Sequence, residues 1–415
     1  MSEAAGGSRI LIYSHDSFGL GHLRRCRTIA HSLVERYRNL SVLILSGSPI
    51  IGSFDFRSRV DFVRVPGVIK LRNGEYTSLS LHIGIEQTLA LRAHIIEQTA
   101  EVFAPDVFIV DKEPLGLRGE VHRTLQQLKQ RGARLVLGLR DVMDEPKSLA
   151  PEWRRKNVMP ALRSLYDEIW VYGLPQVCDP LDGLAVPKMV RNKIVYTGYL
   201  HRTLPVPRAR HRLPDLTQRP YILVTPGGGG DGERLIEWVL RAYEAQPRMP
   251  YPALLVLGPF MRPEKQAEFM RRTERLNNVA AITFDAQIEE LEANAAGVVA
   301  MGGYNTFCEI LSLNKPAIMV PRTRPRMEQY LRTARAQELG LARMLEDDGT
   351  LDAGVMAAAL RLLPFQSKPS DVVIPGLLEG LHNVNRLVEP WLGAVAVPAE
   401  TEGRVAGRLA LVDGK

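Results

Sequence analysis

The chain has 415 residues, of which 45% are hydrophobic and 24% are charged, and its net charge is +7. The length accommodates two domains of ordinary size, and the composition is that of a soluble globular protein. No apolar run reaches the roughly 18 residues that cross a membrane, and residues 1–8 lack the basic and apolar segments of a secretory signal.

The net charge indicates which ligands the protein could bind, and the cysteines indicate its cellular compartment. A positive net charge favours anionic ligands or anionic lipid surfaces. Basic residues are spread along the chain rather than gathered in runs, so we expect no nucleic-acid partner. Cys26, Cys178 and Cys308 lie far apart without metal-ligand spacing, which predicts reduced thiols, a cytoplasmic protein and no metal site.

The first half of the chain alternates short apolar strands with helical stretches. The strands are apolar on both faces, which predicts a parallel sheet covered by helices. We expect them at residues 10–13, 42–45, 62–65, 107–110, 135–139, 169–172 and 194–197. The first helix should run from His22 to about Tyr37, because apolar residues recur there every three or four positions.

A glycine-rich loop, Gly19-Leu20-Gly21-His22, joins the first strand to this helix. A helix N-terminus disfavours the imidazolium, so a neutral His22 could accept a proton from a hydroxyl group. A purely structural or solvated histidine is the alternative, and His15 could take the same role. Asp111 ends a strand whose carboxyl end should face the same crevice, which makes it the reserve candidate for the base or an acceptor ligand.

A proline-rich stretch divides the chain. We predict a linker at residues 204–220 between an N-terminal domain at 9–203 and a C-terminal domain at 221–393, with disordered segments at 1–8 and 394–415. The second half repeats the alternation, with expected strands at 221–225, 253–257, 280–284, 298–301 and 317–320.

Two further glycine-rich loops follow strands in this half. Residues 226–232 read Pro-Gly-Gly-Gly-Gly-Asp-Gly, where backbone N–H groups could approach a phosphate closely. The next strand lacks the terminal acid of a dinucleotide site, which argues against NAD, and a tight turn without a ligand is the alternative. Residues 301–309 read Met-Gly-Gly-Tyr-Asn-Thr-Phe-Cys-Glu. Glu309 could accept from a ribose diol or, with Thr306, form a capping box.

The order of these loops, followed by Val320-Pro321 and Glu328-Gln329, resembles the C-terminal domain of glycosyltransferase family 28, which includes the MurG-type transferases. The resemblance implies the GT-B fold, with two doubly wound Rossmann-like α/β domains facing a central crevice and the nucleotide-sugar on the C-terminal domain. It implies that Gly228 and Gly229 hold the diphosphate, Glu309 the ribose, and Gln329 with Glu328 the donor sugar. Backbone near Phe284 would contact uracil, and the remaining donor-binding candidates are Gly21, Arg202, Gly227, Gly302, Gly303, Asn305 and Thr306.

We therefore expect an enzyme that transfers a sugar from a nucleotide diphosphate, expected to be UDP, to an acceptor hydroxyl. Inversion is implied by the resemblance alone, and we expect neither a metal nor a cofactor. The acceptor, whether a glycan, a lipid-linked molecule or a small molecule, stays open, because the N-terminal acceptor motifs are not those of MurG.

Two alternatives to this function remain open. The front loop, Gly19-x-Gly21-His22-x-x-Arg25, is also similar to UDP-sugar hydrolases of nonulosonic-acid biosynthesis. A UDP-sugar hydrolase or epimerase on the same fold is therefore one alternative, and a non-catalytic nucleotide-sugar-binding protein is the other.

Residues 79–85 are apolar at every second position, which predicts either a buried strand or helix lead-in, or a peripheral contact with the inner face of the membrane.

Overall fold

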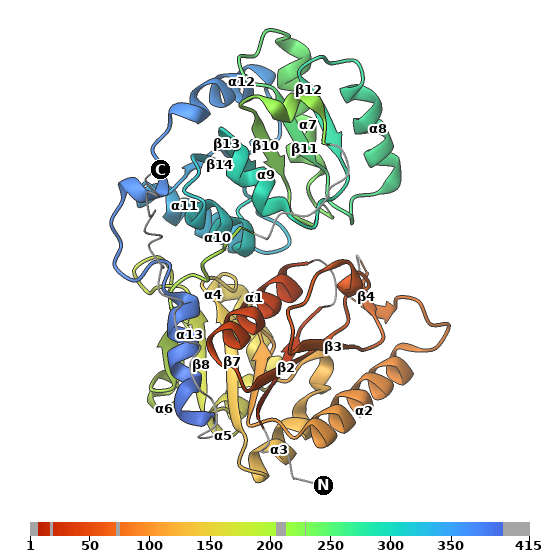
Figure 1. The fold of residues 1–415 in the computed structure, drawn as a ribbon, viewed down its shortest axis with the longest axis vertical. Coiled ribbons are helices and arrows are strands. Elements are labelled where there is room, and N and C mark those ends of the chain that lie inside the picture. Colours follow the sequence, from red (N-terminus) through yellow and green to blue (C-terminus); the bar gives the residue numbers. More distant parts are fainter. Residues whose placement is uncertain (1–6, 17–19, 72–74, 205–212, 229, 393–415) are drawn as a thin grey trace, which may run out of the picture.

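Two parallel sheets organise the computed structural model, which describes residues 7–16, 20–71, 75–204, 213–228 and 230–392. The sheets belong to two α/β domains stacked one above the other (Figure 1). The N-terminal sheet has seven parallel strands in the order β3-β2-β1-β6-β7-β8-β9. These are β1 (Ser8–Ser14), β2 (Leu40–Ser46), β3 (Val60–Arg64), β6 (Val107–Asp111), β7 (Arg134–Arg140), β8 (Glu168–Tyr172) and β9 (Ile194–Tyr196).

The C-terminal sheet has six parallel strands in the order β12-β11-β10-β13-β14-β15. These are β10 (Ile222–Thr225), β11 (Ala253–Val256), β12 (Val279–Ile282), β13 (Gly297–Ala300), β14 (Ala317–Met319) and β15 (Arg343–Met344). All twelve strands expected from the sequence are present. The two-residue β15 and an antiparallel hairpin of β4 (Val68–Lys70) and β5 (Tyr76–Ser78) were not expected.

Helices cover both faces of each sheet, as the doubly apolar strands require. The N-terminal domain carries α1 (Gly21–Arg36), α2 (Ile85–Phe103), α3 (His122–Gln130), α4 (Pro146–Arg155), α5 (Val158–Ser164) and α6 (Lys188–Arg191). The C-terminal domain carries α7 (Glu233–Ala245), α8 (Pro263–Thr273), α9 (Ile288–Asn294), α10 (Tyr304–Ser312), α11 (Glu328–Glu338) and α12 (Ala353–Leu362). The short 3-10 helices are Ile51–Ser53, Leu117–Gly119, Asp215–Gln218, Leu363–Phe365, Pro369–Asp371 and Glu389–Trp391.

The strand order places a ligand crevice in each domain. The chain changes direction across the sheet between β1 and β6, and again between β10 and β13. In open parallel sheets, ligands bind beyond the carboxyl ends of the strands at such a reversal. The loops after β1, β6, β10 and β13 therefore meet between the two domains.

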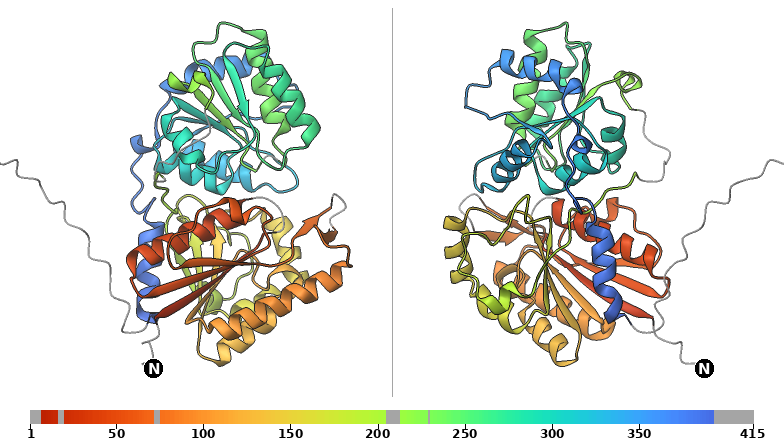
Figure 2. Two further views of the ribbon diagram at one scale, coloured as in Figure 1. Left: turned by 45° about the vertical axis from the view of Figure 1, so that its right-hand side comes forward. Right: turned by 90° about the vertical axis from the view of Figure 1, so that its left-hand side faces the viewer.

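The last helix, α13 (Gly380–Val388), returns to the N-terminal domain (Figure 2). Its Asn385 carbonyl accepts a hydrogen bond from the Tyr37 hydroxyl at 2.8 Å, and Trp391 stacks on Trp170 with ring centroids 6.1 Å apart. The sequence prediction placed this segment in the C-terminal domain at 221–393, whereas in the structure it packs on the N-terminal domain. The structure tests the linker prediction at 204–220 only in part, because residues 205–212 lie outside the described residues. Residues 1–6 and 394–415 of the predicted disordered ends lie outside them as well.

One apolar core cluster and a buried ion pair join the two domains, each of which also has a core cluster of its own. The core cluster joins α1, through Cys26 and Ile29, to α10, through Phe307 and Leu311. Arg332 of α11 donates to both carboxylate oxygens of Asp141, which follows β7, at 2.8 and 2.6 Å. Both side chains are fully buried. The crevice between the domains is therefore held in a closed arrangement.

Candidate active site

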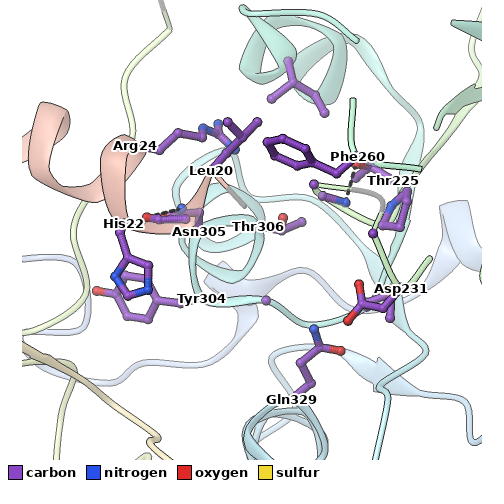
Figure 3. Close-up of a pocket in the computed structure, with 18 of the residues that line it drawn as sticks. Leu20, His22, Arg24, Thr225, Asp231, Phe260, Tyr304, Asn305, Thr306 and Gln329 are labelled. Carbon is purple, nitrogen blue, oxygen red and sulfur yellow. Dashed lines mark hydrogen bonds between the residues drawn. The ribbon is translucent and has the colours of Figure 1, made fainter. Parts of the chain in front are cut away.

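A cavity of about 420 Å³ lies where the loops of the two domains meet (Figure 3). Its N-terminal wall comprises Leu20, Gly21, His22, Arg24, Arg25, Phe54 and Arg140. Its C-terminal wall carries the glycine loop after β10, the start of α10, the Phe284 segment and the start of α11. Most of the residues that the sequence predicted for one site are thus brought to one cavity.

His22 and Asp111 are hydrogen-bonded partners, although 89 positions separate them. Asp111 ends β6, which pairs directly with β1, and α1 begins at the end of the loop that follows β1. This topology brings the first turn of α1 over the end of β6. His22 Nδ1 contacts Asp111 Oδ2, and the imidazole lines the cavity while the carboxylate is buried behind it.

Arg25 completes this group from the same helix. Residues three apart share a helix face, so Arg25 lies beside His22. Its Nε and Nη2 donate to Asp111 Oδ1 and Oδ2 at 2.8 and 2.7 Å, and its Nη2 lies 3.1 Å from His22 Nδ1. Burial raises the pKa of Asp111, but Arg25 and His22 lower it more, so the carboxyl stays ionised well below its ordinary range. Burial lowers the pKa of His22, and Arg25 and Lys112 lower it further against the opposing effect of Asp111.

The C-terminal wall offers backbone N–H groups beside the charged side chains of Asp231, Asp285, Arg322 and Glu328. Gly227 has a φ of +78°, which favours glycine, and Gly228 and Gly230 line the cavity, whereas Gly229 lies outside the described residues. Gly303 is the N-cap of α10 and makes no side-chain capping bond. Thr306 lies inside the helix, so the capping-box alternative does not hold. The free N–H groups of the first turn of α10 suit an anion.

The two ends of the cavity differ in polarity. One end is aromatic: Phe284, Phe260 and Phe54 line it, and the Phe54 and Phe284 rings meet edge to face with centroids 6.3 Å apart. The other end is polar and is formed by Glu328 and Gln329 at the start of α11 (Figure 3). A flat heterocycle suits the first end, and a ligand rich in hydroxyls suits the second.

Comparison with known proteins identifies the C-terminal domain. Residues 222–370 match the glycosyltransferase family 28 C-terminal domain. The chain is a glycosyltransferase with a family 28 C-terminal domain. No curated protein matches its sequence.

Solved glycosyltransferase structures share the fold over both domains. The calicheamicin glycosyltransferase CalG4 is 15% identical, covers 94% of this chain and 100% of its own, and has a TM-score of 0.57. UGT2 of Phytolacca americana, in complex with UDP-2-fluoro-glucose and pterostilbene, is 15% identical with coverages of 92% and 94% and a TM-score of 0.56. MurG of Acinetobacter baumannii is more distant, with 11% identity, coverages of 91% and 95%, and a TM-score of 0.49. The expected GT-B fold is confirmed.

Three donor-site candidates of this glycosyltransferase lie away from the cavity wall. Glu309 is 1% exposed, and its Oε1 pairs with Arg24 Nη2 at 2.6 Å across the domain boundary. Arg202 is buried and donates to Asn305 Oδ1 at 2.7 Å. Gly302 has a φ of +78°, and its carbonyl accepts from Arg332 Nη1 at 2.9 Å. In this closed arrangement all three tie the structure together instead of facing the cavity.

The glycosyltransferase also has cavity residues that sequence reasoning left unassigned. Arg24 reaches from α1 to Glu309 and to Glu289 Oε1, the latter at 2.7 Å. Phe54 and Phe260 had no motif around them. Arg25 stood in the front-loop resemblance, three residues after His22, and this spacing was the available signal. His15 is buried, with its ring centroid 5.7 Å from that of His22, and does not line the cavity.

Two further findings concern metals and membranes. Within the part of the chain that the structure describes, no group of three or more His, Cys, Asp or Glu side chains is arranged to hold a metal ion. None of the described helices of the glycosyltransferase combines the length and apolar character needed to span a bilayer.

Proposed function

We propose that this glycosyltransferase moves a sugar from a UDP-sugar to an acceptor hydroxyl, with inversion at the anomeric carbon and without a metal ion. The observation that carries the proposal is the position of His22. Its imidazole, paired with Asp111, faces the same cavity as the glycine loop after β10 and the first turn of α10. A base and a diphosphate site on opposite walls suit a displacement at a carbon held between them.

The donor would lie along the C-terminal wall. Backbone N–H groups of Gly227, Gly228 and the start of α10 would hold the diphosphate, with the uracil between Phe260 and Phe284. Gln329 and Glu328 would contact sugar hydroxyls. Glu328 suits this role as an acceptor, because Arg140 and Arg332 outweigh the effect of burial and lower its pKa to about 2. The uridine nucleotide bound by the Phytolacca americana enzyme of the same fold is consistent with UDP as the carrier.

The chemical step would use the pair formed by His22 and Asp111. A carboxylate can only accept, so Nδ1 of the neutral imidazole carries the proton and Nε2 presents its lone pair. Nε2 removes the acceptor hydroxyl proton as the oxygen attacks the anomeric carbon. The bond from that carbon to the diphosphate oxygen breaks, and UDP leaves with the electron pair. Attack from the face opposite UDP inverts the configuration.

A donor panel tests the proposal. The full chain is incubated with UDP-, TDP-, GDP- and ADP-sugars, with and without a panel of sugar and phenolic hydroxyl acceptors, and released nucleotide is measured. Release from a UDP-sugar that depends on an added acceptor is the expected result. Release in water alone would make the protein a UDP-sugar hydrolase, and binding without release would make it a nucleotide-sugar-binding protein. The anomeric configuration of the product, read by NMR, tests inversion.

We also propose peripheral contact with the inner face of the membrane through residues 79–83. These residues lie between β5 and α2 and expose Leu79 (38%), Leu81 (44%) and Ile83 (39%). The buried-strand alternative therefore does not hold, whereas the segment does lead into α2, as the helix lead-in alternative expects. Apolar side chains on a basic protein suit an anionic leaflet. Flotation with anionic vesicles at low salt is expected to carry the parent but not a variant with all three residues changed to Ser. Absence of parent binding would remove this proposal.

A further inference from the structure

We propose that Arg25 is a positioning residue of this glycosyltransferase, which fixes Asp111 and keeps His22 in the neutral form that accepts a proton. The proposal rests on the function of His22 proposed above. It concerns a residue to which neither the family match nor the cavity alone gives a role.

Arg25 is fixed more firmly than an arginine that only contacts a ligand. Its side chain is almost fully buried and uses two nitrogens on the two oxygens of Asp111, at 2.8 and 2.7 Å. Its guanidinium also lies over the Tyr304 ring, 5.4 Å from the centroid. Tyr304 begins α10 in the other domain. The closed crevice therefore holds Arg25 against Asp111 from the C-terminal side.

The two oxygens of the Asp111 carboxylate accept hydrogen bonds from different groups. Oδ1 accepts from Arg25 Nε, and Oδ2 accepts from both Arg25 Nη2 and His22 Nδ1. The imidazole is thus held in one orientation and one tautomer. At the same time, the Arg25 charge offsets the negative charge that would otherwise stabilise an imidazolium. Asp111 can therefore orient the His22 imidazole without stabilising its protonated form.

Two cations, Arg25 and Lys112, lower the pKa of His22, and Arg25 has the larger effect. Asp16 holds Ser46 and the backbone of Leu23, and His15 is itself uncharged, because burial lowers its pKa. Several titratable and charged groups face His22 from the elements packed against it. They are Asp111 at the end of β6, Lys112 after it, Arg25 in α1, His15 and Asp16 after β1, Arg140 at the end of β7, and Tyr304 in α10. Arg25 is the cation whose nitrogen lies within 3.1 Å of the imidazole.

The test compares the pH dependence of kcat/KM in the parent, Arg25→Gln and Arg25→Lys. Without the Arg25 charge, the effect of Asp111 on His22 is less opposed, which favours the imidazolium. The acid limb of the Gln profile should therefore move to higher pH by about one unit or more, a tenfold loss at acid pH that is recovered at alkaline pH. Arg25→Lys keeps the charge and should leave the limb near that of the parent.

Arg92→Gln is the matched control. Arg92 is another buried arginine, bound to both oxygens of Glu120 at 2.7 and 2.6 Å, and it does not line the cavity. Its loss should lower the melting temperature without moving the acid limb. An equal loss of kcat/KM at every pH in Arg25→Gln, with the limb unmoved, would overturn the proposal and leave Arg25 a structural residue.

Two further measurements keep the test decisive. If Arg25→Gln does not fold, the histidine NMR signal of the parent that disappears in His22→Gln must titrate below the ordinary pKa of about 6.5. Titration above that value would overturn the proposal. If His22→Ala retains full turnover, the proposed base is wrong, and the Arg25 profile then has no bearing on catalysis. Failure of the proposed role of Arg25 can therefore be distinguished from failure of the proposed role of His22.

Discussion

The two walls of the cavity use different chemistry. The C-terminal wall relies on backbone: the glycine loop after β10 and the first turn of α10 offer N–H groups. The N-terminal wall relies on titratable side chains, with His22, Asp111 and Arg25 in one hydrogen-bonded group. A backbone site is encoded in a short stretch of sequence, whereas a side-chain group is assembled by the fold. The proposed donor wall is therefore easier to recognise from the sequence than the proposed catalytic wall.

The largest expected effect comes from Asp111→Asn on the N-terminal wall. The change leaves Arg25 buried without its anion, and breaking a buried ion pair in this way costs about 3–5 kcal/mol of unfolding free energy. Turnover should fall as well, because an Asn amide no longer fixes the tautomer of His22. Urea unfolding and steady-state kinetics measure the two effects. A variant as stable as the parent would show that the Asp111 group contributes little to stability.

The stability effect of Asp111 should depend on pH in a defined direction. Arg25 and His22 lower its pKa in the folded protein despite the opposing effect of burial. A carboxyl whose pKa is lowered by folding stabilises the protein above its unfolded pKa of about 3.9 and loses that contribution as the pH falls through the folded value. The difference between parent and Asp111→Asn should therefore be full at neutral pH and shrink in strong acid. A difference that grows as the pH falls would contradict this assignment.

A smaller effect is expected from donor binding at the C-terminal wall. UDP at about 100 times its dissociation constant should stabilise the protein by about 2.7 kcal/mol, whereas NAD should not. Thermal-shift measurements with millimolar UDP, UDP-sugars and NAD test this. Since Arg92 does not line the cavity, Arg92→Gln should respond to UDP as the parent does. No response to any nucleoside diphosphate would remove the donor assignment.

An effect of similar size is expected at Glu309, which the resemblance assigns to the ribose. If the donor displaces Arg24 and frees Glu309, Glu309→Gln should weaken UDP binding by about 1.5–3 kcal/mol, because charge-assisted hydrogen bonds are lost. Calorimetric titration and the melting temperature are measured together. A lower melting temperature with unchanged UDP affinity would instead leave Glu309 as the partner of Arg24 seen in the closed crevice.

Features that depend on a short stretch of sequence were predicted well, whereas contacts between residues far apart in the sequence were not. The strands and glycine loops were predictable, because runs such as Ile10 to Tyr13 are apolar on both faces and each loop follows such a run. Position alone placed Asp111 as an alternative to His22, and only the pairing of β1 with β6 makes the two residues partners. The return of α13 to the N-terminal domain carries no local signal, since an amphipathic helix does not specify the surface that it covers.

The most direct test of the account is a paired measurement of turnover and donor affinity in His22→Ala, with His15→Ala as the comparison. His15 is buried nearby but does not line the cavity. We predict that His22→Ala lowers turnover by about 10²–10⁴, leaves the UDP-sugar dissociation constant nearly unchanged, and affects turnover far more than His15→Ala. A large loss of donor affinity with turnover intact would contradict the division between a catalytic N-terminal wall and a donor-binding C-terminal wall.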